Sequence, residues 1–171
     1  RDLNSNFCLV QLQLNKMADA VISAVKAAGS FDEKLVAAMK GICDTKKFAL
    51  ANSWWVDGDV VIATNKPYYV PNPKSQAYRE KSVEFKFPSN KGIPGRVWAG
   101  QKVEWKDSVQ SFTPEQYPRV TVAKECGIHC SFGVPVMKDG AFKCMVEFFL
   151  FEKKDRDEDV IKFAEDVIAA I

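Results

Sequence analysis

The sequence predicts an α+β fold in which N- and C-terminal helices pack on one face of an antiparallel sheet of about five or six strands. Apolar residues recur at helical spacing through residues 1–47 and again through residues 152–171. Residues 48–151 are instead rich in alternating β-branched and aromatic residues, and Asp-Gly steps there suit tight turns between strands. The sheet is therefore expected between two helical parts of the chain.

Length and composition indicate one globular domain over residues 1–171. A chain of 171 residues is of ordinary size for one domain, and its 47% apolar and 27% charged residues exclude a disordered chain. We find no internal repeat and no linker. We therefore expect a helical N-terminal part over 1–47, a sheet with inserted loops and a helix over 48–151, and a closing helix over 152–171.

The charge pattern argues against nucleic-acid and membrane partners. The 24 basic and 22 acidic residues give a net charge of +2 and are interspersed along the chain, so no nucleic-acid partner is expected. The sequence holds no run of about eighteen apolar residues, so we expect no membrane insertion.

The five cysteines are an odd number in a chain large enough to fold without disulfides. We therefore expect mostly free, buried thiols and an intracellular, reducing compartment. The sequence opens at Arg1 without an initiator Met, which is compatible with an excised domain, a truncation or a processed protein. The last of these leaves open an organellar (plastid) location after removal of a transit peptide.

Two helices are predicted before the sheet. The first carries a heptad seam, with apolar residues in alternating steps of four and three, at Leu3, Phe7, Val10, Leu14, Met17 and Val21. Gly29 can end this helix in a left-handed conformation, and Ser30 with Glu33 forms a capping box for the second helix. The seam predicts that the chain forms a homodimer or joins a larger assembly through this helix.

The central region predicts two hairpins separated by a long connection. Residues 48–64 form the first hairpin around the turn at residues 57–59, and residues 128–151 form the second around Asp139 and Gly140. Residues 65–90 hold four of the eight prolines, which predicts an irregular connection with a short alternating strand over residues 83–87.

Two more helices are expected in the second half of the chain. Residues 113–116 carry a helix-start signature, but Pro118 follows, so the helix must bend or restart near Arg119 before it ends at Gly127. Asp155 and Glu158 are spaced as a capping box for the closing helix, which is amphipathic.

The last predicted strand is apolar on both faces, so helices and loops should cover its two sides. Strand alternation places Phe142 with Cys144, on the face opposite Glu147. A buried Glu147 needs a charged or polar partner, for which the candidates are Arg96, Arg119 and His129.

Several of these segments together resemble a GAF domain. They are Gly92–Trp98 (Gly-Ile-Pro-Gly-Arg-Val-Trp), Val103–Trp105 (Val-Glu-Trp), residues 127–136 and Val146–Phe149 (Val-Glu-Phe-Phe), preceded by the hairpin at residues 51–64. The sequence is similar to GAF domains of bacterial sensor proteins and to the GAF-like region of plant and algal RWP-RK nitrate-responsive regulators. The resemblance implies a sheet with a cupped face where a small ligand sits, and a protein that senses and does not turn over substrate.

The residues argue against the cofactor-binding and catalytic branches of the family. Arg119 occupies the position that matches the bilin-attachment cysteine, and the Asn-Lys pair of the cyclic-nucleotide branch is missing. Pro94 replaces one cysteine of the methionine sulfoxide reductases, although Cys126 and Cys130 keep a redox pair as a less favoured alternative. Strand alternation turns His129 away from Cys130, which argues against zinc. We expect no cofactor, no metal and no catalysis.

The candidate ligand-binding residues are aromatic side chains that can line a pocket, two arginines that can anchor an anion, and two further polar groups. They are Trp54, Arg96, Trp105, Tyr117, Arg119, His129 and Glu147. The favoured hypothesis is a sensory domain that binds a small-molecule effector. The alternative is an interaction or scaffold subunit without a ligand, for which we expect a cavity filled by the chain's own aromatic residues.

Overall fold

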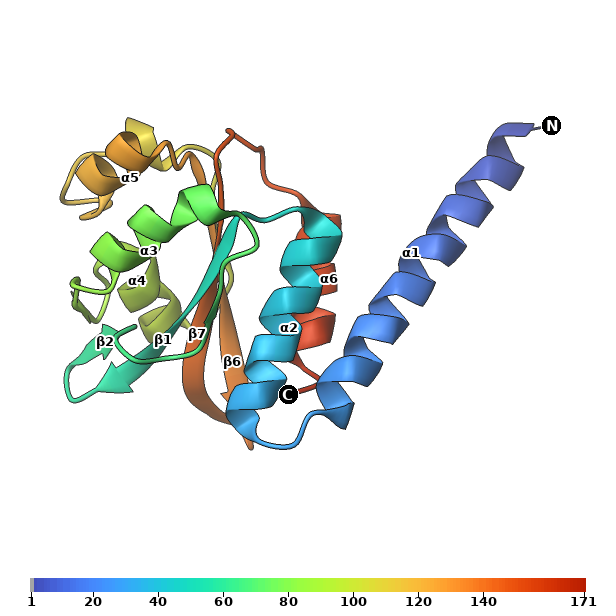
Figure 1. Ribbon diagram of the computed structural model, residues 1–171, viewed down its shortest axis with the longest axis horizontal. Helices are drawn as coiled ribbons and strands as arrows, with labels where there is room; N and C mark the ends of the chain where they lie inside the picture. The colour runs from blue at the N-terminus through green and yellow to red at the C-terminus, as the bar shows by residue number, and fades with distance from the viewer. Residues whose placement is uncertain (1) are drawn as a thin grey trace.

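The computed structural model describes the backbone of residues 2–171 and the side chains of residues 12–13 and 15–171. A single antiparallel sheet lies between two layers of helices (Figure 1). One layer consists of α1 (Asp2–Ala27), α2 (Phe31–Lys46) and α6 (Glu158–Ile168). The other, which we call the cover layer, consists of α3 (Gln76–Ser82), α4 (Gly92–Gly100) and α5 (Val120–Cys126). The predicted α+β class is confirmed, with the N- and C-terminal helices on one face.

The sheet has the strand order β4-β2-β1-β7-β6-β5, and β3 pairs with β1 beside this path. The strands are β1 (Leu50–Asp57), β2 (Val60–Ile62), β3 (Tyr68–Tyr69), β4 (Phe87–Pro88), β5 (Glu104–Lys106), β6 (Cys130–Lys138) and β7 (Ala141–Leu150). The three long strands β1, β7 and β6 lie at the centre. Their register aligns Asn52, Glu147 and Gly133 in one row across the sheet.

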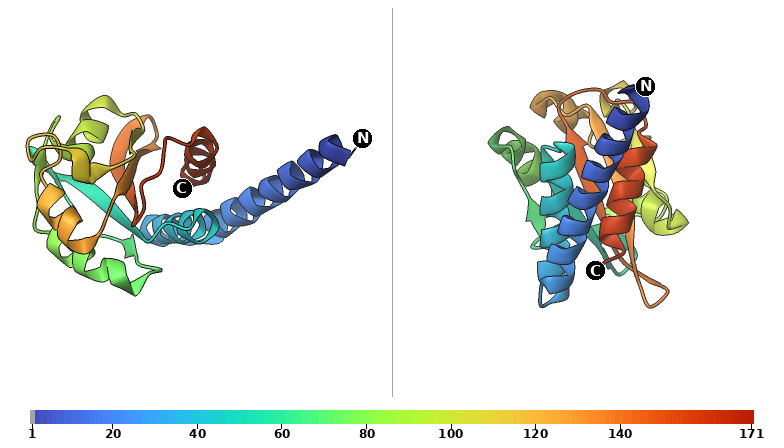
Figure 2. Two further views of the ribbon diagram at one scale, coloured as in Figure 1. Left: turned by 90° about the horizontal axis from the view of Figure 1, so that it is seen from above. Right: turned by 90° about the vertical axis from the view of Figure 1, so that its right-hand side faces the viewer.

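Helix α1 packs against α2 and α6 and extends past them away from the sheet (Figure 1, Figure 2). Four seam residues, Leu3, Phe7, Val10 and Leu14, lie outside the described side chains. Met17 is 45% exposed, whereas Val21 packs against α2 where a Cβ on Gly41 would come within 2.2 Å of it. The absence of a side chain at Gly41 thus permits the close approach of the two helices.

The predicted capping box between α1 and α2 is present. Ser30 Oγ accepts a hydrogen bond from the Glu33 backbone N–H at 3.2 Å, and Glu33 Oε2 accepts one from the Ser30 backbone N–H at 2.7 Å. The left-handed conformation predicted at Gly29 is wrong, because its φ is not positive. The chain instead turns into α2 through the extended backbone of Ser30.

The connection over residues 65–90 is more regular than predicted. It contains β3, a 3-10 turn η1 (Pro73–Ser75) and α3, while the expected strand over residues 83–87 is reduced to β4. Pro73 lies at the start of η1, where its fixed φ suits a helix and no amide donor is needed. The Asn72 side chain accepts a hydrogen bond from the Lys74 backbone N–H at 3.0 Å. The prolines therefore initiate helical structure here and do not prevent it.

The predicted helix restart near Arg119 is present, whereas the predicted start of the closing helix lies too early. Residues 113–117 form only a turn, and α5 begins at Val120, after Pro118, and is capped at its C-terminal end by Gly127 with φ of 72°. Helix α6 is capped by Asp157, whose carboxylate accepts a hydrogen bond from the Val160 backbone N–H at 3.0 Å. Asp155 is therefore not the N-cap.

The second hairpin turns at Asp139 and Gly140 as predicted, with φ of 52° and 74°. Beyond the turn, however, Phe142 packs on the cover-layer face and not with Cys144. A bulge shifts the register so that Val136 pairs with Cys144 and Met137 with Phe142. The extra residue reverses the alternation, which a sequence pattern does not reveal.

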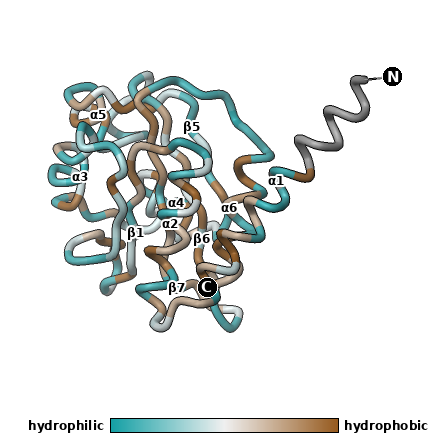
Figure 3. The backbone as a smooth tube through the Cα atoms, turned by 45° about the vertical axis from the view of Figure 1, so that its right-hand side comes forward, coloured by the Kyte–Doolittle hydropathy of each residue, from teal (hydrophilic) through white to brown (hydrophobic). Residues whose placement is uncertain are grey.

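The sheet separates two hydrophobic cores. One includes Leu35, Met39, Phe132, Phe148 and Val167 and lies under α2 and α6. The other includes Trp54, Tyr78, Ile93, Tyr117 and Phe149 and lies under the cover layer. Hydrophobic stretches run through the central strands and the helices against them, and hydrophilic ones dominate the outer loops (Figure 3). Within the described residues, no helix is long and apolar enough to cross a membrane.

Candidate functional site

A buried arginine forms the centre of the core beneath the cover layer. Arg119 directly precedes α5 and is fully buried. Five aromatic rings lie with their centroids 5.0–5.8 Å from its guanidinium carbon: Trp54, Tyr78, Phe87, Tyr117 and Phe149. Cation–π attraction to these rings stabilises the guanidinium where water does not reach it.

The charge of Arg119 is balanced by Glu147, which projects from β7 and is also fully buried. Arg119 Nη2 donates hydrogen bonds to both carboxylate oxygens, at 2.6 Å and 2.8 Å. The Ser131 hydroxyl, on the neighbouring strand β6, donates to Glu147 Oε1 at 2.7 Å. Of the three candidate partners predicted for Glu147, Arg119 is the one that pairs with it. We call Arg119, Glu147, Ser131 and the five rings the Arg119 cluster.

The cluster is electrostatically coupled. Burial is the largest single influence on Arg119 and favours loss of its proton, but Glu147, Tyr117 and Tyr78 together outweigh burial and raise the pKa of Arg119 above its ordinary value. The Tyr78 and Tyr117 hydroxyls form a hydrogen bond of 2.6 Å. Burial raises the pKa of both phenols. At neutral pH the cluster therefore holds a cationic guanidinium and two neutral phenols.

Several polar atoms of this region are buried without a hydrogen-bond partner. Arg119 Nε and Nη1, Trp54 Nε1 and both amide atoms of Asn52, the cross-strand neighbour of Glu147, are of this kind. Buried donors in native proteins are nearly always paired with protein, water or a ligand. Arg119 and Trp54 therefore hold three donor nitrogens that lack an acceptor within the described core.

Four of the seven predicted site residues come together in the cluster: Trp54, Tyr117, Arg119 and Glu147. Arg96, on α4, lies apart and is bound by Glu104 through Nε and Nη2 at 2.7–2.9 Å. Trp105 packs in the opposite core, where its Nε1 donates to the Lys154 carbonyl at 2.9 Å. Arg96 and Trp105 thus have structural partners outside the cluster.

His129 is held by backbone hydrogen bonds and does not belong to the Arg119 cluster. Its N–H donates to the Leu150 carbonyl, and its carbonyl accepts from the Val109 backbone N–H. The cluster also contains residues that the sequence did not single out, chiefly Tyr78, Phe87, Ser131 and Phe149. Tyr78 was missed because α3 lies in the segment predicted to be irregular. Ser131 and Phe149 share the Glu147 face of their strands, so strict alternation could have indicated them.

The cysteines of the suggested redox pair are separated by the sheet. Cys130 is buried in the core under α2 and α6, while Cys126 packs against the core beneath the cover layer. Burial raises the pKa of Cys130 and of Cys144 to about 12, which keeps both as unreactive thiols. Among the described residues, no group of three potential metal ligands occurs.

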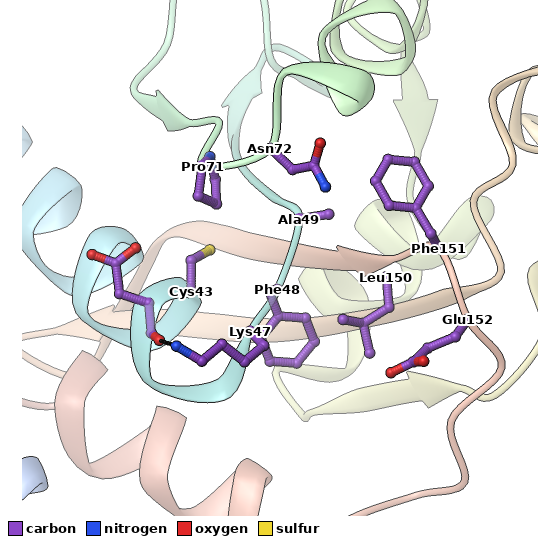
Figure 4. Close-up of a pocket in the computed structure, with 10 residues that line it drawn as sticks. Cys43, Lys47, Phe48, Ala49, Pro71, Asn72, Leu150, Phe151 and Glu152 are labelled. Carbon is purple, nitrogen blue, oxygen red and sulfur yellow. Dashed lines mark hydrogen bonds between the residues drawn. The ribbon is translucent and has the colours of Figure 1, made fainter.

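A separate pocket of about 670 Å³ opens where the end of α2 meets the end of β7 (Figure 4). Its apolar wall includes Phe48, Leu150 and Phe151, and Lys47 Nζ donates to the Asp44 carbonyl at 2.9 Å beside it. None of the predicted site residues lines this pocket. It therefore adds a surface feature distinct from the Arg119 cluster.

An antiparallel sheet between two layers of helices is an arrangement shared with solved GAF-domain structures. The fold matches the GAF domain of a phosphoenolpyruvate-protein phosphotransferase from Coxiella burnetii with a TM-score of 0.69 and 15% identity, covering 92% of each chain. It also matches fRMsr of Staphylococcus aureus in complex with substrate, with a TM-score of 0.70 and 13% identity over 92% of each chain. The chain has a GAF fold, as the sequence predicted.

The family follows from the sequence comparison. Residues 26–170 match the family model described as the NLP protein GAF domain, and the chain belongs to this family. Protein NLP2 of Arabidopsis thaliana is 30% identical over 132 residues, which are 69% of this chain and 14% of NLP2. Protein NLP1 of Oryza sativa subsp. japonica is 30% identical over 97 residues, or 52% of this chain and 10% of that protein. The chain thus spans a small part of these relatives.

Proposed function

We propose that this GAF domain is a non-catalytic sensory or regulatory module that binds a small molecule beside Arg119. The observation that carries the proposal is the set of three unpartnered N–H donors, on Arg119 and Trp54, in a site walled by aromatic rings. Such a site suits a compact hydrogen-bond acceptor. Glu147 already balances the cation, so the ligand need not carry a charge.

Binding at this site is coupled to the conformation of the cover layer. Trp54, Tyr78, Tyr117, Arg119 and Glu147 are each at most 1% exposed, so a ligand reaches them only when the cover layer moves. Tyr78 lies on α3 and Arg119 precedes α5, so contacts with a ligand act directly on these helices. A ligand that favours one arrangement of the layer therefore shifts its population.

We further propose that the change is read out through the terminal helices. Helix α1 packs against both α2 and α6, and Val21 is taken up by the contact with α2, so the remaining residues of the predicted seam, from Leu3 to Met17, are those through which we expect a second copy or a larger assembly to bind. Membership of the NLP family supports a role as one module of a regulator, since the matched part is only 14% of NLP2 of Arabidopsis thaliana.

A second candidate is an interaction or scaffold domain without a ligand. The observation in its favour is that the five rings of the Arg119 cluster fill the region themselves and leave its members buried. A thiol-based reductase is less well supported, because Cys126 and Cys130 pack in different cores.

Native mass spectrometry of the purified domain tests these alternatives. We expect a small molecule to be retained by the wild type and released on denaturation. Trp54→Phe removes one donor and keeps an aromatic ring, so it should weaken retention, while Trp98→Phe, outside the Arg119 cluster, should leave it unchanged. A stable dimer without any retained molecule, in both the wild type and Trp54→Phe, would instead favour the scaffold.

A further inference from the structure

A second arginine is buried at the edge of the cover layer, away from the Arg119 cluster. Arg79 lies on α3 and is only 7% exposed. Its guanidinium carbon lies 4.4 Å from the centroid of the Tyr68 ring, and Nη2 donates a long hydrogen bond of 3.3 Å to the Ala63 carbonyl. Nε is buried and has no hydrogen-bond partner.

Arg79 is not balanced by any carboxylate that the structure describes. The groups in contact with its guanidinium are the Tyr68 ring and the Ala63 carbonyl, and neither is a carboxylate. Burial lowers the pKa of the guanidinium, with only Tyr68 opposing this effect. Buried charges in proteins are nearly always paired, because an unpaired charge loses its hydration without compensation. This arginine therefore lacks an anionic partner.

Arg79 lines a pocket of about 560 Å³ between α2 and the segment before β3. Lys66 also lines the pocket, with Nζ 5.0 Å from the centroid of the Trp55 ring, and likewise has no carboxylate partner among the described residues. Tyr68 and Val36 form an apolar wall and are 46% and 38% exposed. The pocket thus combines two unpaired cations with apolar surface.

Asp32 is the one carboxylate that lines this pocket, and it forms an ion pair with neither cation. It lies in the first turn of α2, where the helix dipole stabilises its charge. The pocket lining therefore carries two positive charges and one negative charge, and its net charge attracts an anion.

We propose that this pocket binds a carboxylate group carried by a small molecule with an apolar body. The planar fork of Arg79 matches the two oxygens of a carboxylate, and Lys66 adds a second cationic contact. Tyr68 and Val36 contact the apolar body. The pocket is open to solvent, and its volume is within the range of sites that hold small ligands. The pocket shares no residue with the Arg119 cluster, so this proposal and the proposed function can each be refuted without the other.

Titration with sodium benzoate, followed by two-dimensional amide NMR of the whole domain, tests the proposal. Benzamide is the matched neutral probe, because it has the same ring and no charge. We expect saturable shifts with benzoate at residues 32–36 and 65–68, and no saturable shifts with benzamide. Equal responses to both probes, or shifts confined to residues 117–126 near the Arg119 cluster, would overturn the proposal.

Substitutions of single cations distinguish direct binding of benzoate by Arg79 from a general effect of the net charge on benzoate affinity. Arg79→Gln should weaken benzoate binding by about tenfold or more, because a charge-assisted hydrogen bond is lost. Lys66→Gln should weaken it less, by under about fivefold, as expected for a partly exposed charge. Arg156→Gln, at an exposed arginine paired with Glu158, is the matched control and should bind as the wild type.

Folding of each variant is checked by its thermal unfolding. If Arg79→Gln does not fold, Arg79→Lys keeps the charge without the planar fork and should still bind benzoate more weakly than the wild type. Unchanged affinity in the folded Arg79 variants contradicts the proposal. Binding of a glutamate-rich hexapeptide without competition by benzoate also contradicts it, because the carboxylate would then belong to a protein partner.

Discussion

Arg119 and Arg79 are the same chemical group buried under the same layer of helices, yet their surroundings differ. Arg119 is held by Glu147 at 2.6 Å and surrounded by five rings. Arg79 has one ring, one long hydrogen bond to a carbonyl and no carboxylate. The difference teaches that burial alone does not identify a structural charge. The first arginine has its counter-charge within the chain, although two of its nitrogens lack a hydrogen-bond partner, whereas the second has no counter-charge among the described residues.

The largest expected effect tests whether the Arg119 pair is structural. Glu147→Gln keeps the shape of the side chain but leaves Arg119 buried without a counter-charge. We expect it to lower the free energy of unfolding by about 3–5 kcal/mol, the usual result of breaking a buried pair. Urea denaturation followed by circular dichroism measures this change.

The control is the double variant Arg119→Met with Glu147→Leu, which removes both charges and fills much of the same volume. It should be more stable than Glu147→Gln alone, because no unpaired charge remains. A loss below about 1 kcal/mol in Glu147→Gln would mean that water already compensates Arg119 and that the two arginines are alike.

A substitution at Asp157, a carboxylate near the surface, should change the free energy of unfolding by an amount between those expected for Glu147→Gln and for the Arg79 variant. Asp157→Ala removes the N-cap of α6 and should lower the free energy of unfolding by about 1 kcal/mol at neutral pH. Burial raises the pKa of Asp157, but the Val160 backbone N–H and Lys154 outweigh burial and lower it overall. Its ionic contribution is therefore present above the ordinary pKa of about 3.9 and lost as the pH falls through the lowered value.

Urea denaturation of the wild type and Asp157→Ala at several pH values tests this dependence. The difference between them should shrink only below about pH 4. Asp155→Ala, at a residue that does not cap the helix, is the control and should have little effect. An equal loss in both variants would show that the cap identified in the structure is wrong.

The smallest effect is expected at the unpaired arginine. Arg79→Met keeps the aliphatic part of the side chain and removes a charge that has no partner. The lost contacts with Tyr68 and Ala63 and the relieved desolvation oppose each other, so the free energy of unfolding should change by less than about 1 kcal/mol. A loss as large as that of Glu147→Gln would reveal a counter-charge for Arg79 and remove the contrast between the two sites.

Sequence patterns predicted the paired site better than the unpaired one. Glu147 lies in a strand that is apolar on both faces, so its burial and its need for a partner followed from alternation, and Arg119 was one of three candidates. Arg79 gave no such signal, because the absence of a carboxylate is a property of the packed chain. Helix α3, which carries it, was also missed, since the surrounding prolines suggested an irregular segment.

The same reasoning explains which parts of the fold were predicted. The turn at Asp139 and Gly140 and the capping box at Ser30 depend on neighbouring residues, and the structure contains both. The orientation of Phe142 depends on a bulge. The core that Trp105 enters depends on how the short strand β5 pairs with β6, because this pairing decides on which side of the sheet its side chain lies. Such features arise from pairing between distant strands.

The short helices of the cover layer have a kinetic consequence. Helices α3 and α5 have seven residues each, too few to persist without tertiary contacts. They are therefore expected to open locally, at a lower free energy than the whole domain unfolds. A molecule held beside Arg119 would escape only during such openings. Its residence time would then follow the opening rate of this layer, so the domain would respond to a falling ligand concentration with a delay.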